Sequence, residues 1–586
     1  MTDRNIIREQ SDVLIIGGGI AGLCQAIKVK ETNPELDVLI VEKATAGTSG
    51  KSNKGAGIIM YVPTKIDDPD GGWDLVDLEI DDFVEWITRN LGQYLNDQPL
   101  LEKFAYATRE YMQDLQRWGV KFQSQVDPDD EQQEYGVQSF CTIVEGYWRL
   151  AVMDHSSTQN LRKFATKIGV RFVDKTQMVD LTHAADGSIN GLTGFNLLTG
   201  DFFVANAKAV VLATGSCNYM NQHMWFSARG DGAAAAYRAG AEIRDAEFSN
   251  FYNIVTSGSS FNICGPACME TVYNQAKEPW YYKYIVENKD LDISSAYLYG
   301  MLREVKAGHG PMLFKRDQLI GFDLTDELPV TKKFFEATEQ GREIEYDLYK
   351  GGEYTPCAPS LLGEFSAVRV DNDMRTTLEG LWAIGDTSYT GSAMCGALPG
   401  PPGRMRGSGN GFAAGSAEMA YKSIVEYAST AKLKAQDEAE IEKQKERIYA
   451  PFDRADADNP RNAIWDLRCA LQRFDYSIAK TESSVLEAMG KVKDIIKRAD
   501  EHVGANGDYH MLGLCLDLKN MATCALLYYQ AALARTESRG FHIRVEYPVR
   551  NDHDFVAWSV QKLDENGRNK LWFEPVPLED WGSFIY

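Results

Sequence analysis

Near the N-terminus, the pattern of apolar and polar positions predicts a strand, a tight turn and a helix. The apolar run 13–16 leads straight into the glycine-rich segment 17–22, and a helical stretch then continues to Asn33–Pro34. A second apolar run, residues 38–41, ends in the acid Glu42. Strand, glycine turn, helix and second strand in this order predict a parallel βαβ unit.

The glycine spacing gives this unit a binding function. Gly17 permits the tight turn, Gly19 lets backbone N–H groups approach a pyrophosphate at the helix N-terminus, and Gly22 lets the helix pack on the sheet. Glu42, twenty residues after Gly22, can accept hydrogen bonds from a ribose. GxGxxG alone is a weak signal, but this context predicts a dinucleotide site. The acid favours a free ribose over a 2′-phosphate, and therefore FAD or NAD over NADP.

Two later apolar runs also end in small residues. The run 209–212 ends in Ala213, Thr214 and Gly215, and the run 381–384 ends in Gly385 and Asp386. Such ends are typical of strands whose backbone lies against a cofactor. An ordinary exit from a strand uses glycine equally well, so both interpretations stay open here.

The rest of the chain divides into an insert and a helical part. Residues 251–350 lack the βα rhythm and hold many aromatic side chains, which predicts a capping domain inserted between two parts of a nucleotide-binding domain (1–250 and 351–431). From 461 to 547 there is no proline and apolar residues recur at helical spacing, which predicts a helical domain over 432–547. Residues 548–586 show no clear periodicity and form a predicted C-terminal tail.

Composition excludes several classes of function. The chain has 586 residues, 44% apolar and 25% charged, as in ordinary globular proteins. Its net charge of −23 argues against nucleic-acid binding, which needs clustered Lys and Arg. No run of 18 apolar residues occurs, residues 521–534 are expected to be a buried helix, and the N-terminus lacks a signal pattern. We therefore expect a cytoplasmic protein without a membrane span.

Cysteine spacing bears on metals and redox groups. Ten cysteines are scattered along the chain without a CxxC pair. This arrangement predicts no iron–sulfur cluster, no disulfide framework and no metal site in this chain.

Three later segments occur in a fixed order: GDG at 230–232 with YRAGAE at 237–242, RVD at 369–371 through GD at 385–386, and TESRG at 536–540 with YP at 547–548. In sequence and order they resemble the flavoprotein subunits of the succinate dehydrogenase/fumarate reductase superfamily. That superfamily includes L-aspartate oxidase and the adenylylsulfate reductase alpha subunit. The match runs from about residue 10 to about residue 575.

The resemblance implies an α/β fold: a Rossmann-like FAD-binding domain with an inserted α+β capping domain and a C-terminal helical domain. It also implies FAD, with substrate between the flavin ring and the cap. The three turn glycines would hold the pyrophosphate, Glu42 the adenosine ribose and Asp386 the ribityl chain, while loop 49–57 would run beside the isoalloxazine. The full set of candidate cofactor residues is Gly17, Gly19, Gly22, Glu42, Lys43, Ser49, Gly50, Lys51, Ser52, Gly55, Ala56, Gly57, Ala213, Thr214, Gly215, Asp231, Gly385, Asp386 and Asn410.

Departures from the family pattern concern the flavin linkage and the substrate. Succinate dehydrogenases attach FAD through a histidine of that loop, and Gly50 stands there here, so we predict noncovalent FAD. Tyr252 replaces one substrate histidine, the stretch 361–366 lacks the second, and 294–297 lacks the family's proton-donating arginine. The loss of these groups makes succinate or fumarate an improbable substrate.

The candidate catalytic residues are Arg406, Arg404 and Tyr252. Arg406 matches the one family arginine that survives, and with Arg404 it lies in a Gly/Pro loop suited to anion binding. Both could instead be structural arginines, and Tyr252 could be a general acid, a stacking ring or a core residue. Lys51 could stabilise reduced flavin, a role that backbone amides also fill, and Glu364 could be a base or simply exposed.

These features predict an FAD-dependent oxidoreductase subunit that moves two electrons between flavin N5 and a small polar or anionic substrate. Because the chain has no cluster motif, electrons would be exchanged with a separate ferredoxin-like iron–sulfur subunit. Two alternatives stay open: a subunit like adenylylsulfate reductase alpha, and an electron-transfer flavoprotein without its own small-molecule substrate. The oligomeric state is also open.

Overall fold

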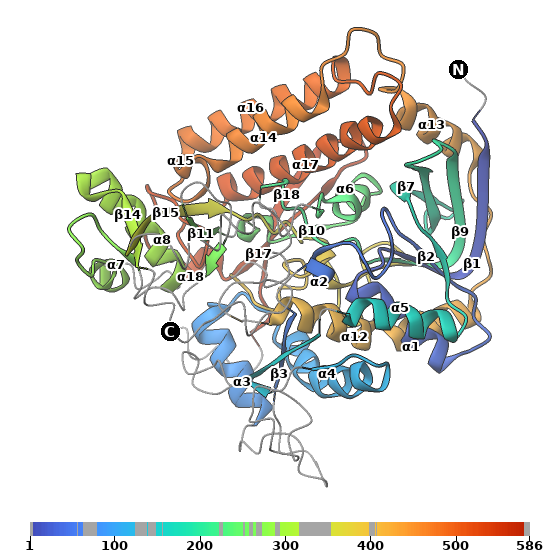
Figure 1. Ribbon diagram of the computed structural model, residues 1–586, viewed down its shortest axis with the longest axis horizontal. Coiled ribbons are helices and arrows are strands. Elements are labelled where there is room, and N and C mark those ends of the chain that lie inside the picture. The colour runs from blue at the N-terminus through green and yellow to red at the C-terminus, as the bar shows by residue number, and fades with distance from the viewer. Residues whose placement is uncertain are drawn as a thin grey trace.

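The computed structural model describes residues 4–54, 57–62, 79–122, 137–138, 148–154, 156–221, 227–249, 252–256, 262–264, 272–287, 293–315, 353–397, 405 and 407–578. In Figure 1 a sheet flanked by helices lies on one side, a helical layer runs along the top, and a smaller unit containing α7 and α8 projects on the opposite side. The predicted arrangement of nucleotide domain, cap and helical domain is confirmed.

The nucleotide domain is built on one sheet with the strand order β6-β2-β1-β9-β8-β7, and β16 pairs with β9. Every pairing among β6, β2, β1, β9 and β16 is parallel, whereas β8 is antiparallel to both of its neighbours, β7 and β9. Parallel strands buried on both faces need continuous apolar runs, which is why β2 is apolar at all four positions. The bounds are β1 Ile6–Ile16, β2 Val38–Val41, β6 Arg171–Val173, β7 Thr176–His183, β8 Ile189–Asn196, β9 Phe202–Leu212 and β16 Leu381–Ala383.

Helices pack against this sheet, and further elements of the domain lie below it in Figure 1. In both views α12 (Ser408–Thr430) runs alongside α1 (Ile20–Thr32). A small antiparallel sheet, order β3-β5-β4, lies next to them with two further helices. The remaining bounds of this part are α2 Lys51–Lys54, β3 Ile58–Tyr61, α3 Ile80–Trp86, a π-helix Ile87–Leu91, α4 Gln98–Arg117, β4 Val137–Gln138, β5 Arg149–Val152, α5 Ser157–Lys167 and α6 Asp231–Arg238.

The cap is an antiparallel sheet, order β12-β11-β15-β14-β13, with two helices. Because β15 pairs with both β11 and β14, the cap continues to Leu361, past the boundary predicted at residue 350. Its aromatic side chains form the cap's own core: Trp280 and Tyr297 are buried, with ring centroids 4.8 Å apart. The bounds are β11 Tyr252–Thr256, β12 Asn262–Cys264, β13 Val272–Tyr273, α7 Tyr281–Glu287, α8 Ile293–Glu304, a π-helix Val305–His309, β14 Met312–Lys315 and β15 Tyr354–Leu361.

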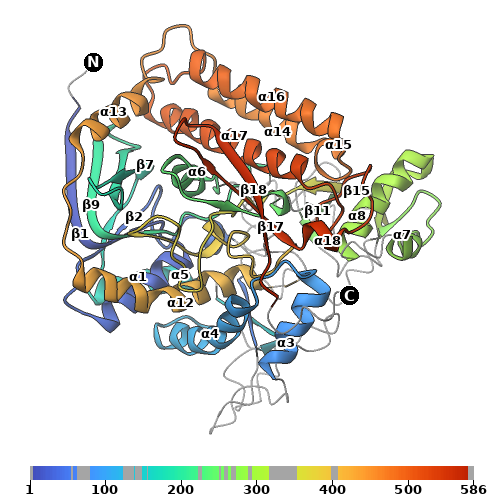
Figure 2. The same ribbon diagram turned by 180° about the vertical axis from the view of Figure 1, so that it is seen from behind.

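The helical domain begins its helices at well-formed caps. The side chains of Asn459, Thr481 and Asp508 accept hydrogen bonds from backbone N–H groups of the first turns of α14, α16 and α17. Figure 2 shows these three helices stacked as one layer above the sheet. The bounds are α13 Glu438–Tyr449, α14 Pro460–Gln472, α15 Phe474–Ser477, α16 Glu482–Glu501 and α17 Tyr509–Ala534.

Helix α17 contains the segment 521–534 that the sequence predicts to be a buried helix. By length and composition α17 could cross a membrane, and it is the one such helix within the part of the chain that the structure describes. However, 78% of its apolar window is buried inside the fold. The core helix of a domain passes the same test, and packing against α14, α16 and α6 explains why α17 is apolar almost all round.

The C-terminal segment, predicted only as a tail, is largely a β-hairpin. After a short helix α18 (Asp552–Phe555), β17 (Ala557–Leu563) and β18 (Asn569–Pro575) pair with each other, and β17 also pairs with β10 (Ile243–Arg244). The hairpin is therefore docked to the nucleotide domain by strand pairing over more than 300 residues of sequence.

A buried ionic network fastens this C-terminal region. The Arg535 guanidinium is fully buried, lying 2.6 Å from Glu247 and 2.9 Å from Glu537, and it donates to the backbone oxygens of Phe555 and Ala557. Glu247 belongs to the short 3₁₀ helix Ala246–Phe248 of the nucleotide domain. One side chain thus joins that domain, the end of α17 and the start of the hairpin.

Candidate functional site

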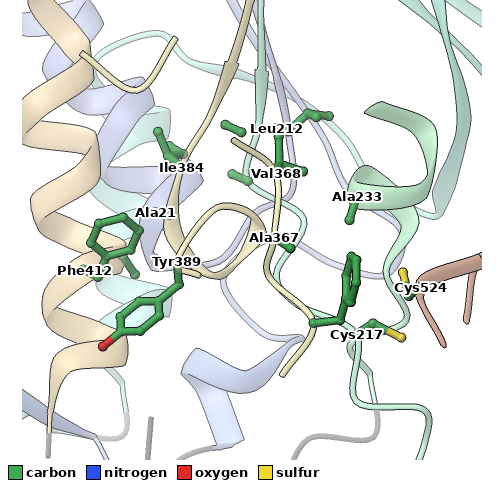
Figure 3. Close-up of a cluster of buried hydrophobic side chains, with 14 of the residues drawn as sticks. Ala21, Leu212, Cys217, Ala233, Ala367, Val368, Ile384, Tyr389, Phe412 and Cys524 are labelled. Atoms are coloured by element: carbon green, nitrogen blue, oxygen red, sulfur yellow. The ribbon is translucent and has the colours of Figure 1, made fainter. Parts of the chain in front are cut away.

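The site lies where three parallel strands of the nucleotide domain end together. The last residues of β1 and β9, Ile16 and Leu212, are register partners, and Leu212 also pairs with Ala383 of β16. Figure 3 shows Leu212, Ile384 and the start of α1 at Ala21 close together at this edge. Ligands of open α/β sheets bind outside the carboxyl ends of the strands, so this edge is the candidate dinucleotide site.

The glycine turn has the geometry that its sequence predicts. Gly17 has φ +111°, and a Cβ atom there would lie 2.2 Å from the Ala213 carbonyl oxygen. A Cβ on Gly22 would lie 2.0 Å from the Gly17 carbonyl oxygen. Only glycine fits at either position. Gly19 caps α1 without a side-chain hydrogen bond, which leaves the N-terminal dipole of that helix for a phosphate.

Glu42 lies at the rim of this turn. Its carboxylate accepts hydrogen bonds from the Gly18 N–H at 2.7 Å, the Ala44 N–H at 2.9 Å and the Ser49 hydroxyl at 3.0 Å. These bonds fix the carboxylate next to the pyrophosphate turn, the place that a ribose-binding acid must occupy.

The predicted flavin loop begins beside the same turn. Gly50 has φ +84°, and no atom lies within 4 Å of the position that its Cβ would take. The Ser52 hydroxyl accepts a hydrogen bond from the Ile20 N–H at 3.4 Å. Gly57 has φ +73°, and Asn410 on α12 donates to the Ile58 carbonyl oxygen at 2.8 Å. Gly55 and Ala56 lie outside the described residues.

Lys51, from that loop, is the centre of a buried charge cluster. Its ammonium nitrogen lies 2.6 Å from the Glu364 carboxylate and 2.6 Å from that of Asp386, and it donates to the Ser216 hydroxyl at 3.2 Å. The Ser216 hydroxyl is also 2.8 Å from Glu364. Four segments far apart in sequence meet here: α2, the loops after β9 and β15, and the 3₁₀ helix Gly385–Thr387 that follows β16.

In this cluster one cation lies between two acids. The pKa values of Glu364 and Lys51 reflect the opposing effects of burial and neighbouring charge. Burial raises the pKa of Glu364 to about 7, with Lys51 opposing the rise and Asp386 adding to it. Burial lowers the pKa of Lys51, but Asp386 and Glu364 outweigh it and raise that pKa overall. Lys51 therefore stays charged at neutral pH, while Glu364 is poised to gain or lose a proton.

Open space and unused polar atoms at this edge fit a dinucleotide. Asp386 Oδ1 is buried and has no hydrogen-bond partner among the described residues. Gly215, with φ +76°, has nothing within 4 Å of its would-be Cβ, as at Gly50. Thr214 holds its loop by donating its backbone N–H to Thr387 Oγ1 at 2.9 Å. Asp386 can therefore accept a hydrogen bond from a ribityl hydroxyl, and the glycine surfaces leave room for the coenzyme backbone.

Two predicted cofactor residues have their side chains engaged elsewhere. Lys43 lies 3.0 Å from Asp231 and 2.5 Å from Asp517 of α17, and Arg229 also pairs with Asp517. This second network ties the nucleotide domain to the helical domain. Lys43 and Asp231 could therefore offer a coenzyme chiefly their backbone atoms.

The predicted catalytic residues are only partly placed. Arg404 and Arg406 lie outside the described residues. Tyr252 is 4% exposed at the start of β11, opposite Leu361 of β15. Burial raises the pKa of its hydroxyl well above the ordinary value, so it does not ionise near neutral pH. Tyr252 is therefore a buried, neutral side chain at the start of the cap sheet, close to Tyr528 of α17.

Sequence reasoning underrated one residue and missed another. Glu364 is 1% exposed, against the interpretation that it is simply a surface acid, and it pairs with Lys51 across 313 positions of sequence. Ser216 is not among the residues that the sequence patterns indicate, although it directly follows the Ala213-Thr214-Gly215 strand end. A polar residue immediately after a cofactor-type strand end is the signal that could have found it.

The raised pKa of Glu364 has a consequence for stability. Its folded pKa lies above the ordinary value of 4.5, so Glu364 stabilises the fold fully below about pH 4.5 and loses that contribution as pH rises through about 7. We expect apoprotein carrying Glu364→Gln to match wild type at low pH. Above pH 7 it should be more stable by roughly 3 kcal/mol. Urea denaturation across pH checks this, and a difference that shrinks as pH rises would contradict it.

Gly50 leads to a prediction about the linkage of the flavin. Because glycine has no side chain to bond to the ring, acid precipitation of the loaded protein should release FAD into the supernatant. Absorbance of the two fractions measures this. Yellow colour retained in the washed precipitate would show a covalent bond formed elsewhere on the chain.

Comparison with known proteins agrees with this geometry. The sequence model of the FAD binding domain family matches residues 12–259, and that of the fumarate reductase flavoprotein C-terminal family matches residues 468–584, together more than half of the chain. Within the described residues, no group of three His, Cys, Asp or Glu side chains could hold a metal.

Full-length relatives and solved structures point the same way. A fumarate reductase flavoprotein subunit of Mycobacterium tuberculosis is 27% identical, covering 98% of this chain and 99% of the relative. An uncharacterised FAD-dependent oxidoreductase of Methanocaldococcus jannaschii is 26% identical, covering 98% and 100%. Escherichia coli quinol fumarate reductase has the same fold, with a TM-score of 0.80 at 19% identity over 98% of both chains. Adenylylsulfate reductase of Archaeoglobus fulgidus has a TM-score of 0.78 at 19% identity, covering 98% of this chain and 97% of that one. The chain is an FAD-dependent oxidoreductase that belongs to the flavoprotein family of succinate dehydrogenases and fumarate reductases.

Proposed function

We propose that this protein is a catalytic subunit that moves two electrons between FAD and a small polar or anionic substrate other than succinate or fumarate. When bound, the flavin supplies hydride chemistry at N5. The chain's own residues bind it at the carboxyl edge of the sheet, shield it with the cap, and provide the charge and protons around the substrate.

The charge balance of the Lys51 cluster carries this proposal. A dicarboxylate needs at least two cationic partners, because each unpaired carboxylate buried near protein acids costs free energy. Among the described residues, the one cation of the cluster, Lys51, is already held by Glu364 and Asp386. Tyr252 and the stretch 361–366 supply neither of the histidines that the family resemblance leads one to expect. The Lys51 cluster therefore favours a substrate with at most one negative charge on the side that faces the cluster.

A separate iron–sulfur protein is the proposed electron partner. Among the cysteines whose side chains the structure describes, all are free and all except Cys469 are buried; they are Cys24, Cys217, Cys357, Cys395, Cys469, Cys515 and Cys524. Relatives carry names such as fumarate reductase flavoprotein subunit and succinate dehydrogenase flavoprotein subunit, which describe one part of a larger enzyme. With no cluster motif of its own, this chain would receive electrons one at a time from that partner and pass them on in pairs.

A panel of electron acceptors tests the proposal. The FAD-loaded protein, reduced anaerobically by a low-potential dye, is mixed in turn with fumarate, other activated alkenes with one or no carboxylate, and adenylylsulfate. We expect flavin reoxidation with a singly charged or neutral acceptor and none with fumarate. Rapid reoxidation by fumarate would overturn the proposal. Reoxidation by adenylylsulfate alone would support the alternative that the structural likeness to adenylylsulfate reductase suggests. Dye reduction with no acceptor turned over would favour an electron-transfer flavoprotein.

A further inference from the structure

The acid Glu364 is buried at the carboxyl edge of the sheet, in contact with a charged lysine. Its two carboxylate oxygens lie 2.8 and 2.6 Å from the Lys51 nitrogen, and its side chain is 1% exposed. The same nitrogen lies 2.6 Å from Asp386. A single cation shared by two carboxylates leaves one acid in excess, and in a buried site that excess charge is unstable.

The cluster lies at the candidate coenzyme site. Lys51 follows the open Gly50 surface of the flavin loop, and Asp386 presents one buried unpartnered oxygen at the same edge. When two electrons and one proton are added to an oxidised flavin, the ring gains a net negative charge. A negative charge arriving beside Glu364 and Asp386 strengthens the binding of a proton to whichever of them can take it.

We propose that Glu364 stores one proton each time the flavin is reduced, and that Lys51 and Asp386 set how tightly it holds that proton. The step rests on the proposed function, which supplies the electrons from an iron–sulfur donor. Two electrons and one proton go to the flavin, and one proton from solvent forms an O–H bond at the Glu364 carboxylate. When a substrate takes two electrons and two protons, that O–H bond breaks and Glu364 returns to the carboxylate.

The surroundings of Glu364 suit this role. The charged groups facing it among the described residues are Lys51 from α2 and Asp386 from the 3₁₀ helix after β16. The Ser216 hydroxyl from the loop after β9 lies 2.8 Å away, and the Glu364 N–H donates to the Ser249 carbonyl oxygen at 2.8 Å. Burial raises the pKa of Glu364 to about 7, so the proton is exchanged in the neutral range. Asp386 stays paired with Lys51 and can serve the ribityl chain.

The test is the pH dependence of the flavin midpoint potential, measured without substrate from about pH 6 to about pH 9. In wild type, reduction above pH 7 takes up one proton more than in Glu364→Gln. The potential of wild type should therefore fall by about 30 mV more per pH unit, the value for a tenfold change in a two-electron couple. Glu438→Gln, an exposed acid paired with Arg8, is the matched control and should follow wild type.

Two further measurements keep the test decisive if Glu364→Gln binds FAD poorly. Lys51→Met removes the cation that opposes protonation of Glu364. The pH range in which the midpoint potential falls more steeply should therefore begin at least about one pH unit higher. In wild type, the reduced-minus-oxidised infrared spectrum should contain the C=O stretch of a newly protonated carboxylic acid, and Glu364→Asp should retain a shifted band. Parallel potential curves for wild type and Glu364→Gln, or no such infrared band in wild type, would overturn the proposal.

These outcomes are separable from those of the proposed function. If the acceptor panel gives no turnover but the midpoint potential of wild type still falls more steeply with pH than that of Glu364→Gln, the substrate proposal fails. The role of Glu364 in storing a proton then stands. If turnover occurs as expected but the slopes are equal, the proton store fails alone.

Discussion

Replacing Gly17 by alanine should strongly weaken FAD binding. A Cβ atom would lie 2.2 Å from the Ala213 carbonyl oxygen, and φ +111° is a conformation that L side chains rarely adopt. The clash is with backbone, so β1 and β9 would have to move apart at the edge where the coenzyme lies. We expect colourless protein and an FAD affinity lower by roughly 100-fold or more, equivalent to about 3 kcal/mol. Fluorescence titration of apoprotein with FAD measures this.

Gly187→Ala is the matched control for that experiment. Gly187 also has positive φ, +84°, but no atom lies within 4 Å of its would-be Cβ. It should cost about 1 kcal/mol of stability and leave FAD affinity unchanged. If Gly17→Ala binds FAD as wild type does, the coenzyme does not use this turn.

Arg535→Met should be the most destabilising single change outside the site. It leaves Glu247 and Glu537 buried without the guanidinium that lies 2.6 and 2.9 Å away, and it removes two hydrogen bonds to backbone oxygens. Removing one partner of a buried ion pair costs about 3–5 kcal/mol. Urea denaturation followed by circular dichroism should show a midpoint far below that of wild type, with the C-terminal hairpin exposed to protease.

Arg473→Met provides the comparison. Arg473 pairs with Asp475 at 2.6 Å, but its side chain is 49% exposed, so its loss should leave the urea midpoint close to that of wild type. Equal effects of the two substitutions would show that the buried network does not hold the C-terminal region in place.

Local patterns predicted the part of the fold that determines where the coenzyme binds. Apolar runs ending in glycine identified the ends of β1, β9 and β16, because buried parallel strands must be continuously apolar and a close backbone approach requires glycine. The helical domain was equally visible, since its apolar positions repeat with the helical period. In these places the residues of one short segment are sufficient to determine the local structure.

Features that depend on distant pairing were not predictable in this way. The hairpin of β17 and β18 was missed because part of its stability comes from β10, more than 300 residues earlier. The end of the cap was misplaced because β15 joins β11 and β14 by pairing, which leaves no mark at residue 350. The Lys51–Glu364 contact likewise joins residues 313 apart, and neither residue alone reveals the other.

An experimental structure of the FAD-loaded protein tests the central claim most directly, because the account places the flavin ring against the Lys51–Glu364–Asp386 cluster. The measurement is the distance from the isoalloxazine and the ribityl hydroxyls to these three side chains. We expect a ribityl hydroxyl within hydrogen-bond distance of Asp386 and the ring in contact with Lys51 or Glu364. A ring placed instead at the Lys43–Asp231–Asp517 network, or beyond contact with all three residues, would contradict the account.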